Sequence, residues 1–452
     1  MIFNPWTTRF EHCWTDEEID RVVAVPASPV SLEGRPANAG AEILRGVLGK
    51  IFFPTAQTRG KLRLMNDIAY SHARSHFLSE EVYMYGLYEP NPWGEHVSPA
   101  VCVTGLAGIG KSALIRAFRT LIGPDTLIDV GDHKNIPLVS GWILTLRDGT
   151  EMNQLLRPCV MPDFPQPDLV DFPVSVKRLS VPELLSLARR RSWRDGVCWL
   201  AIDEFQHITL GSETNAKAAS VLLKFLGVGP QVVYVANFSL LHRLKKRGQE
   251  DRDRFLHMPI VVYPEARSSP DFIGMLVEYT KAAPETLSFD VNSTQELIHE
   301  CTFGIPRSII CLLIVATRDR LARGKRARMD DDDLVRAYRS AEYAACREDV
   351  EDLLRQQITG KIVRRDLWCP FSGLDDIASF TSAKKAVEGF RQRVEEDYLR
   401  SSLTAAEAEA LRSIENKHSE ESPPDRVVPL KKPKITRESL LEGSEKFDKL
   451  HH

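Results

Sequence analysis

The chain has 452 residues, of which 43% are hydrophobic and 27% are charged, so it is typical of soluble globular protein and too long for one ordinary domain. Its 59 basic and 62 acidic side chains leave a formal net charge of −3. No overall field therefore attracts it to nucleic acid, and any DNA contact must come from a local basic patch. The eight cysteines include no C-x-x-C pair, which argues against a zinc ribbon or a disulfide framework.

The N-terminus lacks a basic-then-apolar signal peptide, and the longest apolar stretch, residues 308–317, is about half the length of a membrane span. Together with the scattered cysteines, this predicts a cytoplasmic protein with no membrane partner. Residues 1–97 mix aromatic residues, prolines and short helical patterns, and they end in a loop rich in proline and glycine. We expect a domain boundary there, and we interpret residues 1–97 as a region that contacts a partner or DNA.

Residues 98–268 alternate apolar strands with helical patterns, which predicts a parallel α/β sheet. Between the second and third of these strands lies a proline-rich insert, residues 158–182, which we interpret as an extended surface loop. The predicted strands are 100–104, 142–146, 197–202, 231–236 and 260–263.

Strand patterns stop after residue 270, and the spacing of apolar residues then indicates helices. Four helices are expected at 271–282, 293–302, 306–322 and 331–346, within a helical domain that spans residues 269–350. Residues 351–418 carry further helical patterns. Residues 419–452 are rich in Pro, Lys, Glu and Ser, so we expect a flexible tail.

A glycine-rich segment follows the first predicted strand directly and precedes an amphipathic helical pattern. It reads GLAGIGKS and matches G-x-x-x-x-G-K-[ST]. Glycines let successive N–H groups point inward, and the helix N-terminus that follows favours phosphate charge. Lys111 is expected to reach the β and γ phosphates, and Ser112 to bind Mg²⁺. The residues that we assign to the nucleotide in this loop are Gly105, Gly108, Ile109, Gly110, Lys111, Ser112 and Ala113.

Two carboxylates, Asp203 and Glu204, end the apolar run of residues 197–202. Parallel α/β sheets bind ligands at the carboxyl ends of their strands, so this position places both acids beside the phosphate-binding loop. Asp203 is expected to hold Mg²⁺ through water, and Glu204 to orient or deprotonate the attacking water. The alternative is a strand that simply ends in solvated acids.

This order of motifs resembles the AAA+ superfamily of ATPases. Residues 202–208, IDEFQHI, are similar to the transposition regulators TnsC and TniB, since most AAA+ proteins do not follow the two acids with Gln-His. The likeness covers about residues 98–350, and the length of the chain is closer to the plan of TnsC. It implies an α/β fold of the AAA+ P-loop NTPase type, with a parallel sheet core, a C-terminal helical lid, and N- and C-terminal extensions.

The resemblance also assigns roles to four further residues. Asn237 looks like sensor 1, a polar side chain that helps to hold the lytic water. Arg252 and Arg254 resemble an arginine pair that reaches the γ-phosphate in a neighbouring subunit. The alternative is local pairing with Glu250, Asp251 and Asp253. Arg307 resembles sensor 2, an arginine at the start of a lid helix that binds the nucleotide. The alternative is a plain arginine at a helix N-terminus.

The family plan implies a homo-oligomer, as a ring or a helix, that assembles on double-stranded DNA with ATP and Mg²⁺. The assembly would link a target-selector protein of the TnsD or TniQ type to transposase subunits of the TnsA or TnsB type. Two alternatives stay open. One is a replication initiator or helicase loader with the same fold, and the other is a signalling scaffold that nucleotide only holds closed.

Local basic clusters are the candidates for DNA phosphate contacts. Lys217 and Lys224 belong to the predicted helix after the acidic strand, and a second group follows Asn237. This group consists of Arg243, Lys245, Lys246 and Arg247. A third cluster runs from Arg318 to Arg328 at the end of a predicted helix. A solvated face is the alternative for the second and third clusters. We assign no metal ligand role to His207.

Overall fold

The computed structural model describes residues 4–95, 97–147, 151–161, 179–206, 214–267, 269–324 and 329–371. All of them belong to the first of two compact units, Met1–Val387. The part of the predicted helical region 351–418 that follows residue 371, and the predicted tail, lie outside the described residues, as does His207.

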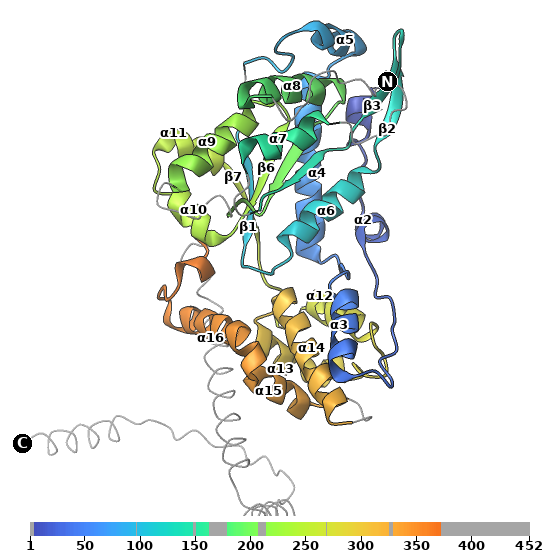
Figure 1. The fold of residues 1–452 in the computed structure, drawn as a ribbon, viewed down its shortest axis with the longest axis vertical. Helices are drawn as coiled ribbons and strands as arrows, with labels where there is room; N and C mark the ends of the chain where they lie inside the picture. Colours follow the sequence, from blue (N-terminus) through green and yellow to red (C-terminus); the bar gives the residue numbers. More distant parts are fainter. Residues whose placement is uncertain are drawn as a thin grey trace, which may run out of the picture. The chain divides into compact units, whose positions relative to one another are not determined.

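A five-stranded parallel sheet forms the centre of the fold, in the order β4-β5-β6-β1-β7 (Figure 1). The prediction of five strands is confirmed, and each predicted end lies within two residues of the observed one. The strands are β1 Val101–Gly105, β4 Trp142–Thr145, β5 Trp199–Asp203, β6 Gln231–Ala236 and β7 Met258–Val262. Every residue of β1, β5 and β6 is buried, which explains why these strands read as continuous apolar runs.

Alternate residues of the central strands face two separate apolar clusters, as the period of two requires. Val101 and Val233 point into the cluster that α4 (Ala56–His76) and α6 (Lys111–Ile122) cover. Cys102 and Val232 point into the other. Five helices contribute to that second cluster: α7 Met152–Val160, α8 Val181–Arg194, α9 Thr214–Leu226, α10 Phe238–Leu244 and α11 Gln249–Phe255. The sheet is thus covered by helices on both faces.

The N-terminal segment packs into this core, which the sequence did not indicate. Leu62, Met65 and Ala69 of α4 lie in the same apolar cluster as Val101 and Val233. Residues on both sides of position 97 therefore share one core, and the domain boundary predicted there stays a prediction. The other N-terminal helices are α1 Pro5–Thr8, α2 Asp16–Val23, α3 Ala37–Leu48 and α5 Glu80–Tyr88.

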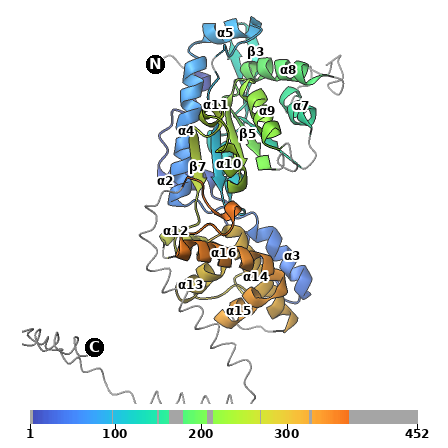
Figure 2. The ribbon, with the colours of Figure 1, turned by 90° about the vertical axis from the view of Figure 1, so that its left-hand side faces the viewer.

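The helix α3 lies against α14 (Pro306–Ala322) of the C-terminal helical region (Figures 1 and 2). A Cβ atom on Gly40 would lie 2.7 Å from the Leu321 side chain, so the two helices approach closely. The backbone N–H of Val30 also donates to the carbonyl of Ala282 at 2.9 Å. The N-terminal segment therefore contacts both the sheet core and the helical lid.

The lid contains α12 Pro270–Thr280, α13 Val291–Thr302, α14, α15 Asp331–Arg339 and α16 Ala344–Thr359, with short 3₁₀ turns at η3 Ala341–Tyr343 and η4 Arg365–Leu367. The first three predicted helices are confirmed. The fourth, residues 331–346, is wrong as one helix because Ser340 adopts an extended backbone, with φ −64° and ψ 153°. The Ser340 hydroxyl then accepts a hydrogen bond from the backbone N–H of Tyr343 at 3.3 Å and starts a new turn.

One other local prediction needs correction, and one pair of strands was not predicted. Pro158 lies inside α7 and Pro182 lies in the first turn of α8, so both ends of the predicted proline-rich loop are helical. Proline is well tolerated at a helix start because the N–H that it lacks has no partner there. The strands β2 (Thr126–Val130) and β3 (His133–Leu138) form a hairpin that was not predicted, and Gly131 and Asp132 connect them.

No single helix in the described part of the chain is both long and apolar enough to cross a membrane. The pair α13 and α14 meets that test only together, with a bend of 111° between them.

Candidate nucleotide-binding site

The glycine-rich loop connects β1 to α6 at the carboxyl edge of the sheet. Gly108 and Gly110 have positive φ angles of 77° and 101°, which side chains rarely adopt. A Cβ on Gly108 would also lie 2.6 Å from the Cβ of Arg307. No described side chain caps the N-terminus of α6, so its first N–H groups remain available to an anion.

Lys111 is the buried cation of this loop, with 8% of its surface exposed. Its ammonium donates hydrogen bonds to the carbonyls of Gly105 at 3.0 Å and Leu106 at 2.8 Å. Burial lowers the pKa of Lys111 to about 8, an effect that Glu204 opposes and Arg307 reinforces. A phosphate group would restore the charge that burial disfavours.

The acidic strand end meets the loop directly. The hydroxyl of Ser112 donates to Asp203 Oδ1 at 3.0 Å, across 91 residues of sequence. This oxygen pair suits Mg²⁺, which prefers carboxylate and hydroxyl ligands and keeps several of its waters. The prediction that the loop and the acids lie side by side is therefore confirmed.

Glu204 adopts the left-handed backbone conformation, with φ 57°, and its N–H donates to Asp203 Oδ1 at 2.9 Å. Such a conformation is uncommon for a residue with a side chain and often marks a functional position. The amide of Gln206 donates a hydrogen bond to the Glu204 carboxylate. Sequence reasoning noted Gln206 only as part of the family resemblance and missed this contact.

Asn237 completes the site from the strand between the other two. Because β6 lies between β1 and β5, its carboxyl end falls between the loop and the acids. The side-chain oxygen of Asn237 accepts a hydrogen bond from Lys111 at 2.8 Å. The structure thus brings Asn237 to the predicted position.

Arg307 reaches the site from the lid. Its backbone N–H, in the first turn of α14, donates to the carbonyl of Gly108 at 3.2 Å. Its side chain is exposed and close enough to contribute to the lowered pKa of Lys111. The predicted nucleotide residues of the loop, the acidic strand end, Asn237 and Arg307 therefore form one group.

The order of the strands, the position of the glycine-rich loop and the helices after the sheet all fit the fold class that the sequence predicts. The fold is that of an α/β P-loop NTPase, with a parallel sheet covered by helices and a glycine-rich loop between β1 and α6. No protein-family model matches the sequence, and no curated protein matches it.

Solved structures give low-scoring matches. The Orc1 protein of Aeropyrum pernix, in complex with DNA, is 16% identical, with 64% of this chain and 69% of that chain covered and a TM-score of 0.35. A katanin structure that addresses self-assembly is 13% identical, with 60% and 86% covered and a TM-score of 0.33. DnaA from Aquifex aeolicus, bound to AMPPCP, is 12% identical, with 70% and 89% covered and a TM-score of 0.29. The fold assignment rests on this chain's own geometry.

The predicted arginine pair lies on α11 (Gln249–Phe255), and both side chains are exposed. Arg254 forms an ion pair with Glu250 at 2.6 Å. Among the described residues, no hydrogen bond or ion pair joins Arg252 or Arg254 to the glycine-rich loop. Their assignment to a neighbouring subunit stays a prediction.

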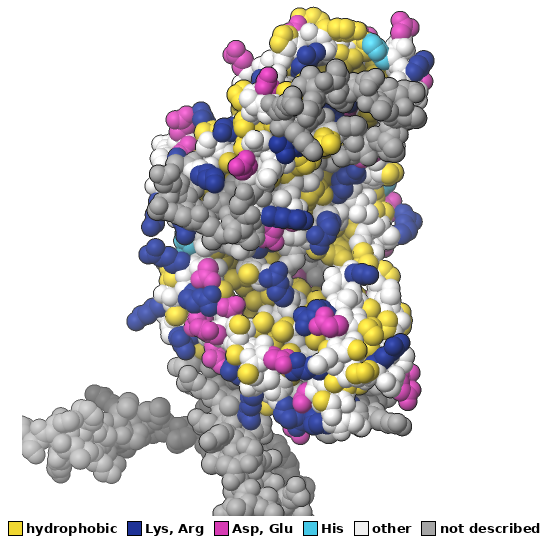
Figure 3. Space-filling model, viewed as in Figure 1, with side chains coloured by type: hydrophobic (Ala, Val, Ile, Leu, Met, Phe, Trp, Pro, Cys, Tyr) yellow, Lys and Arg dark blue, Asp and Glu magenta, His cyan; other side chains and the backbone are white. Residues whose placement is uncertain are grey.

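The predicted DNA-binding cations lie on α9 and α10 and just after α10. Lys217 and Lys224 are exposed on α9, and Arg243, Lys245 and Lys246 are also exposed. Figure 3 shows basic side chains mixed with acidic ones over this part of the molecule. A hollow of about 380 Å³ is lined by Ala219, Ser220, Leu223, Lys224 and Arg247.

Lys245 and Arg247 have partners among the described residues. Lys245 donates to the carbonyl of Pro370 and lies 5.3 Å from the centre of the Phe371 ring. Arg247 pairs with Asp251. These contacts reduce, but do not remove, the charge that this region presents.

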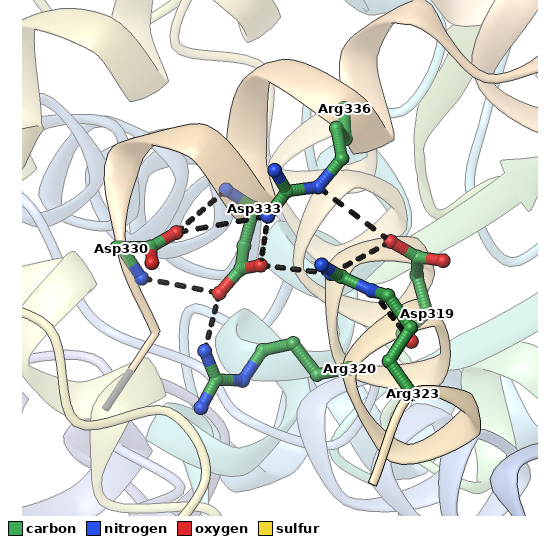
Figure 4. Close-up of polar contacts among 6 residues, drawn as sticks. All are labelled: Asp319, Arg320, Arg323, Asp330, Asp333 and Arg336. Carbon is green, nitrogen blue, oxygen red and sulfur yellow. Dashed lines mark hydrogen bonds and ion pairs between the residues drawn. The ribbon is translucent and has the colours of Figure 1, made fainter. Parts of the chain in front are cut away.

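In the basic cluster near the end of α14, the predicted DNA contact is wrong for Arg320, because its side chain is buried. Arg320 is only 1% exposed and pairs with the buried Asp333, which also accepts hydrogen bonds from Arg323 and Arg336 (Figure 4). Arg318 pairs with Glu342. The described arginines thus join helices of the lid, and a solvated face is also wrong for Arg320. Lys325, Arg326 and Arg328 lie outside the described residues.

Proposed function

We propose that this chain is a Mg²⁺-dependent ATPase that acts as an ATP-gated assembly switch on DNA. The observation that carries the proposal is the contact between Ser112 and Asp203 beside the buried Lys111. A purely structural loop has no need of a buried ammonium, a magnesium-type oxygen pair and an uncapped helix N-terminus at one point.

The residues around this point can divide the chemistry of phosphoryl transfer among them. When bound, Mg²⁺ would neutralise charge on the phosphate oxygens. Lys111 would exchange its carbonyl partners for phosphate oxygens. Glu204 would accept a proton from the attacking water or orient that water, while Asn237 would help to hold it. Arg307 would bind the phosphates from the lid.

The exposure of Arg252 and Arg254 supports the proposal that the chain forms an oligomer. An arginine that completes the site of a neighbouring subunit must be exposed in the single chain, as these two are. We therefore infer a ring or helical homo-oligomer in which each α11 faces the glycine-rich loop of the next subunit.

The finer role that we propose is that of a cytoplasmic transposition regulator of the TnsC type. Its support is the stretch IDEFQHI, together with the exposed cations on α9. In this role the ATP-bound assembly encloses DNA and connects a target-selector protein to the transposase. Hydrolysis then releases the DNA.

The decisive experiment is substitution of the proposed water-orienting acid. Glu204→Gln should lower ATP hydrolysis about 10²–10⁴-fold while ATP binding persists and assemblies stay on DNA. Lys111→Ala is the matched control, because it should abolish ATP binding itself. Normal hydrolysis by Glu204→Gln would exclude the proposed mechanism, and a chain that binds ATP but never hydrolyses it would favour the scaffold alternative.

The DNA contact has a separate test. Lys217→Ala and Lys224→Ala should each reduce the dependence of DNA affinity on salt by about one unit of slope. Lys134→Ala, an exposed lysine on β3, is the control. An unchanged slope in both α9 variants would place the DNA elsewhere on the molecule.

A further inference from the structure

A pair of cysteines in the lid forms a chemical site that the proposed ATPase mechanism does not use. Cys311 belongs to α14 and Cys346 to the first turn of α16. The two thiols are free and partly exposed, and they lie close enough to influence each other's ionisation. Among the described residues, no group of three or more His, Cys, Asp or Glu side chains could hold a metal ion.

Hydrogen bonds from Tyr343 fix the start of α16 against α14 near these cysteines. The hydroxyl of Tyr343 donates to the carbonyl of Ser308 at 3.3 Å and to that of Cys301 at 2.9 Å. Cys311 and Cys346 lie three residues further along the same two segments. The side chain of Ser308 also lies close enough to Cys346 to contribute to the lowered pKa of its thiol. The thiols therefore face each other from elements that a buried tyrosine already aligns.

The two sulfur atoms differ in their chemistry. The neighbouring thiol of Cys311 lowers the pKa of Cys346 to about 7, against the opposing effect of burial. The same interaction, together with burial, raises the pKa of Cys311. The position of Cys346 in the first turn of α16 also favours a negative charge. At neutral pH a substantial fraction of Cys346 is thus the nucleophilic thiolate, whereas Cys311 stays protonated.

We propose that Cys311 and Cys346 are a reversible oxidation site whose disulfide fastens α14 to α16. The oxidant is a hydroperoxide. The Cys346 thiolate attacks its terminal oxygen, the O–O bond breaks, and the leaving oxygen takes up a proton and departs as water or an alcohol. The resulting sulfenic acid is attacked by Cys311, the S–O bond breaks, water leaves and the S–S bond forms. Two sulfur atoms lose two electrons, and the peroxide gains them.

The disulfide would act on the nucleotide site through the start of α14. Arg307 precedes Cys311 by about one helical turn, and its backbone contacts Gly108. A link at Cys311 fixes this turn against α16, so movement of the lid arginine relative to the glycine-rich loop is restricted. This consequence rests on the proposed ATPase function, whereas the oxidation itself does not.

The test is treatment of the full chain with hydrogen peroxide, followed by mass spectrometry of unreduced peptides. A linked Cys311–Cys346 peptide pair, two hydrogens lighter than the free peptides and cleaved by a thiol reductant, is expected. Cys311→Ser should stop at a sulfenic acid on Cys346 that dimedone traps, and Cys346→Ser should form no link. Cys13→Ser, which removes an exposed thiol, is the control and should behave as the unsubstituted chain.

Absence of the linked pair, or dimedone labelling of Cys13 as fast as that of Cys346, would overturn the proposal. The oxidised protein should hydrolyse ATP several-fold more slowly and recover on reduction. An unchanged rate in the linked protein would overturn the coupling to Arg307. If the reduced chain has no ATPase activity, the proposed function fails, while the peptide result still decides the oxidation site.

Discussion

Arginines alternate with aspartates in the same way in two helices of this chain, as DRDR at residues 251–254 of α11 and as RDR at residues 318–320 of α14. In α11 both arginines are exposed, and the ion pair of Arg254 with Glu250 lies in solvent. In α14, Arg320 is buried against Asp333. The same local pattern therefore has two outcomes.

The packing of each helix accounts for the difference. Phe255 is the one buried residue of α11, so the rest of its surface is open to solvent. The helix α14 packs against both α3 and α15, and Arg320 is buried against Asp333 of α15. An arginine buried in this way needs a carboxylate partner, whereas an exposed arginine is available to another subunit. Exposure, rather than the pattern of charges, separates the candidate functional arginines from the structural ones.

The largest effect expected from this comparison is on turnover. Arg252→Ala or Arg254→Ala should lower ATP hydrolysis in the assembled state about 10³–10⁵-fold for the residue that acts across subunits. The free energy of unfolding should change by less than about 0.5 kcal/mol, since both side chains are exposed. Arg45→Ala, an exposed arginine with an acid three residues earlier, is the control. Normal turnover in both variants of α11 would remove the arginine pair from the mechanism.

A loss of stability comes next. Asp333→Ala leaves Arg320 buried without its partner and should lower the free energy of unfolding by roughly 3–5 kcal/mol, as measured by chemical denaturation. Glu250→Ala breaks the exposed pair on α11 and should cost less than about 1 kcal/mol. Equal effects of the two substitutions would contradict the distinction between the two sets of arginines.

The Asp333 cluster also predicts a dependence on pH. Burial opposes the ionisation of Asp333, but hydrogen bonds from Arg323, Arg320 and Arg336 outweigh it and hold the pKa of this carboxyl well below its ordinary value. The stabilisation is therefore present above the unfolded pKa of about 4 and is lost as the pH falls through the folded value. Stability measured against pH should fall more steeply below about 4 in the unsubstituted chain than in Asp333→Asn.

The smallest effect concerns Lys111, a buried cation with carbonyl partners instead of a carboxylate. Because its pKa is about 8 in the nucleotide-free chain and phosphate favours the charged form, ATP binding should take up a proton above that pH. The affinity should fall by up to about tenfold per pH unit there. Calorimetry in buffers of different ionisation enthalpy measures the proton uptake. An affinity that stays constant from pH 7 to 10 would contradict the lowered pKa.

Local sequence patterns determined much of this protein. The five strands of the sheet, three lid helices and the glycine-rich loop are all encoded by neighbouring residues, through continuous apolar runs, helical spacing and glycines that permit positive φ. The identities of Lys111, Ser112, Asp203 and Glu204 follow from the same kind of signal. Each of these features spans a few consecutive residues, which is why the sequence alone reveals it.

Only the tertiary structure decided the rest. The contact between Ser112 and Asp203 joins residues 91 positions apart. It depends on the order of the sheet, in which β6 lies between β1, the strand before Ser112, and β5, the strand that ends at Asp203. Arg320 is buried against Asp333 of α15, and the cover that α4 gives the sheet depends on apolar residues of α4 that share one cluster with residues of β1 and β6. Such contacts arise from packing between distant segments, and the free energy of burying a side chain depends on what surrounds it in the folded chain rather than on its neighbours in sequence.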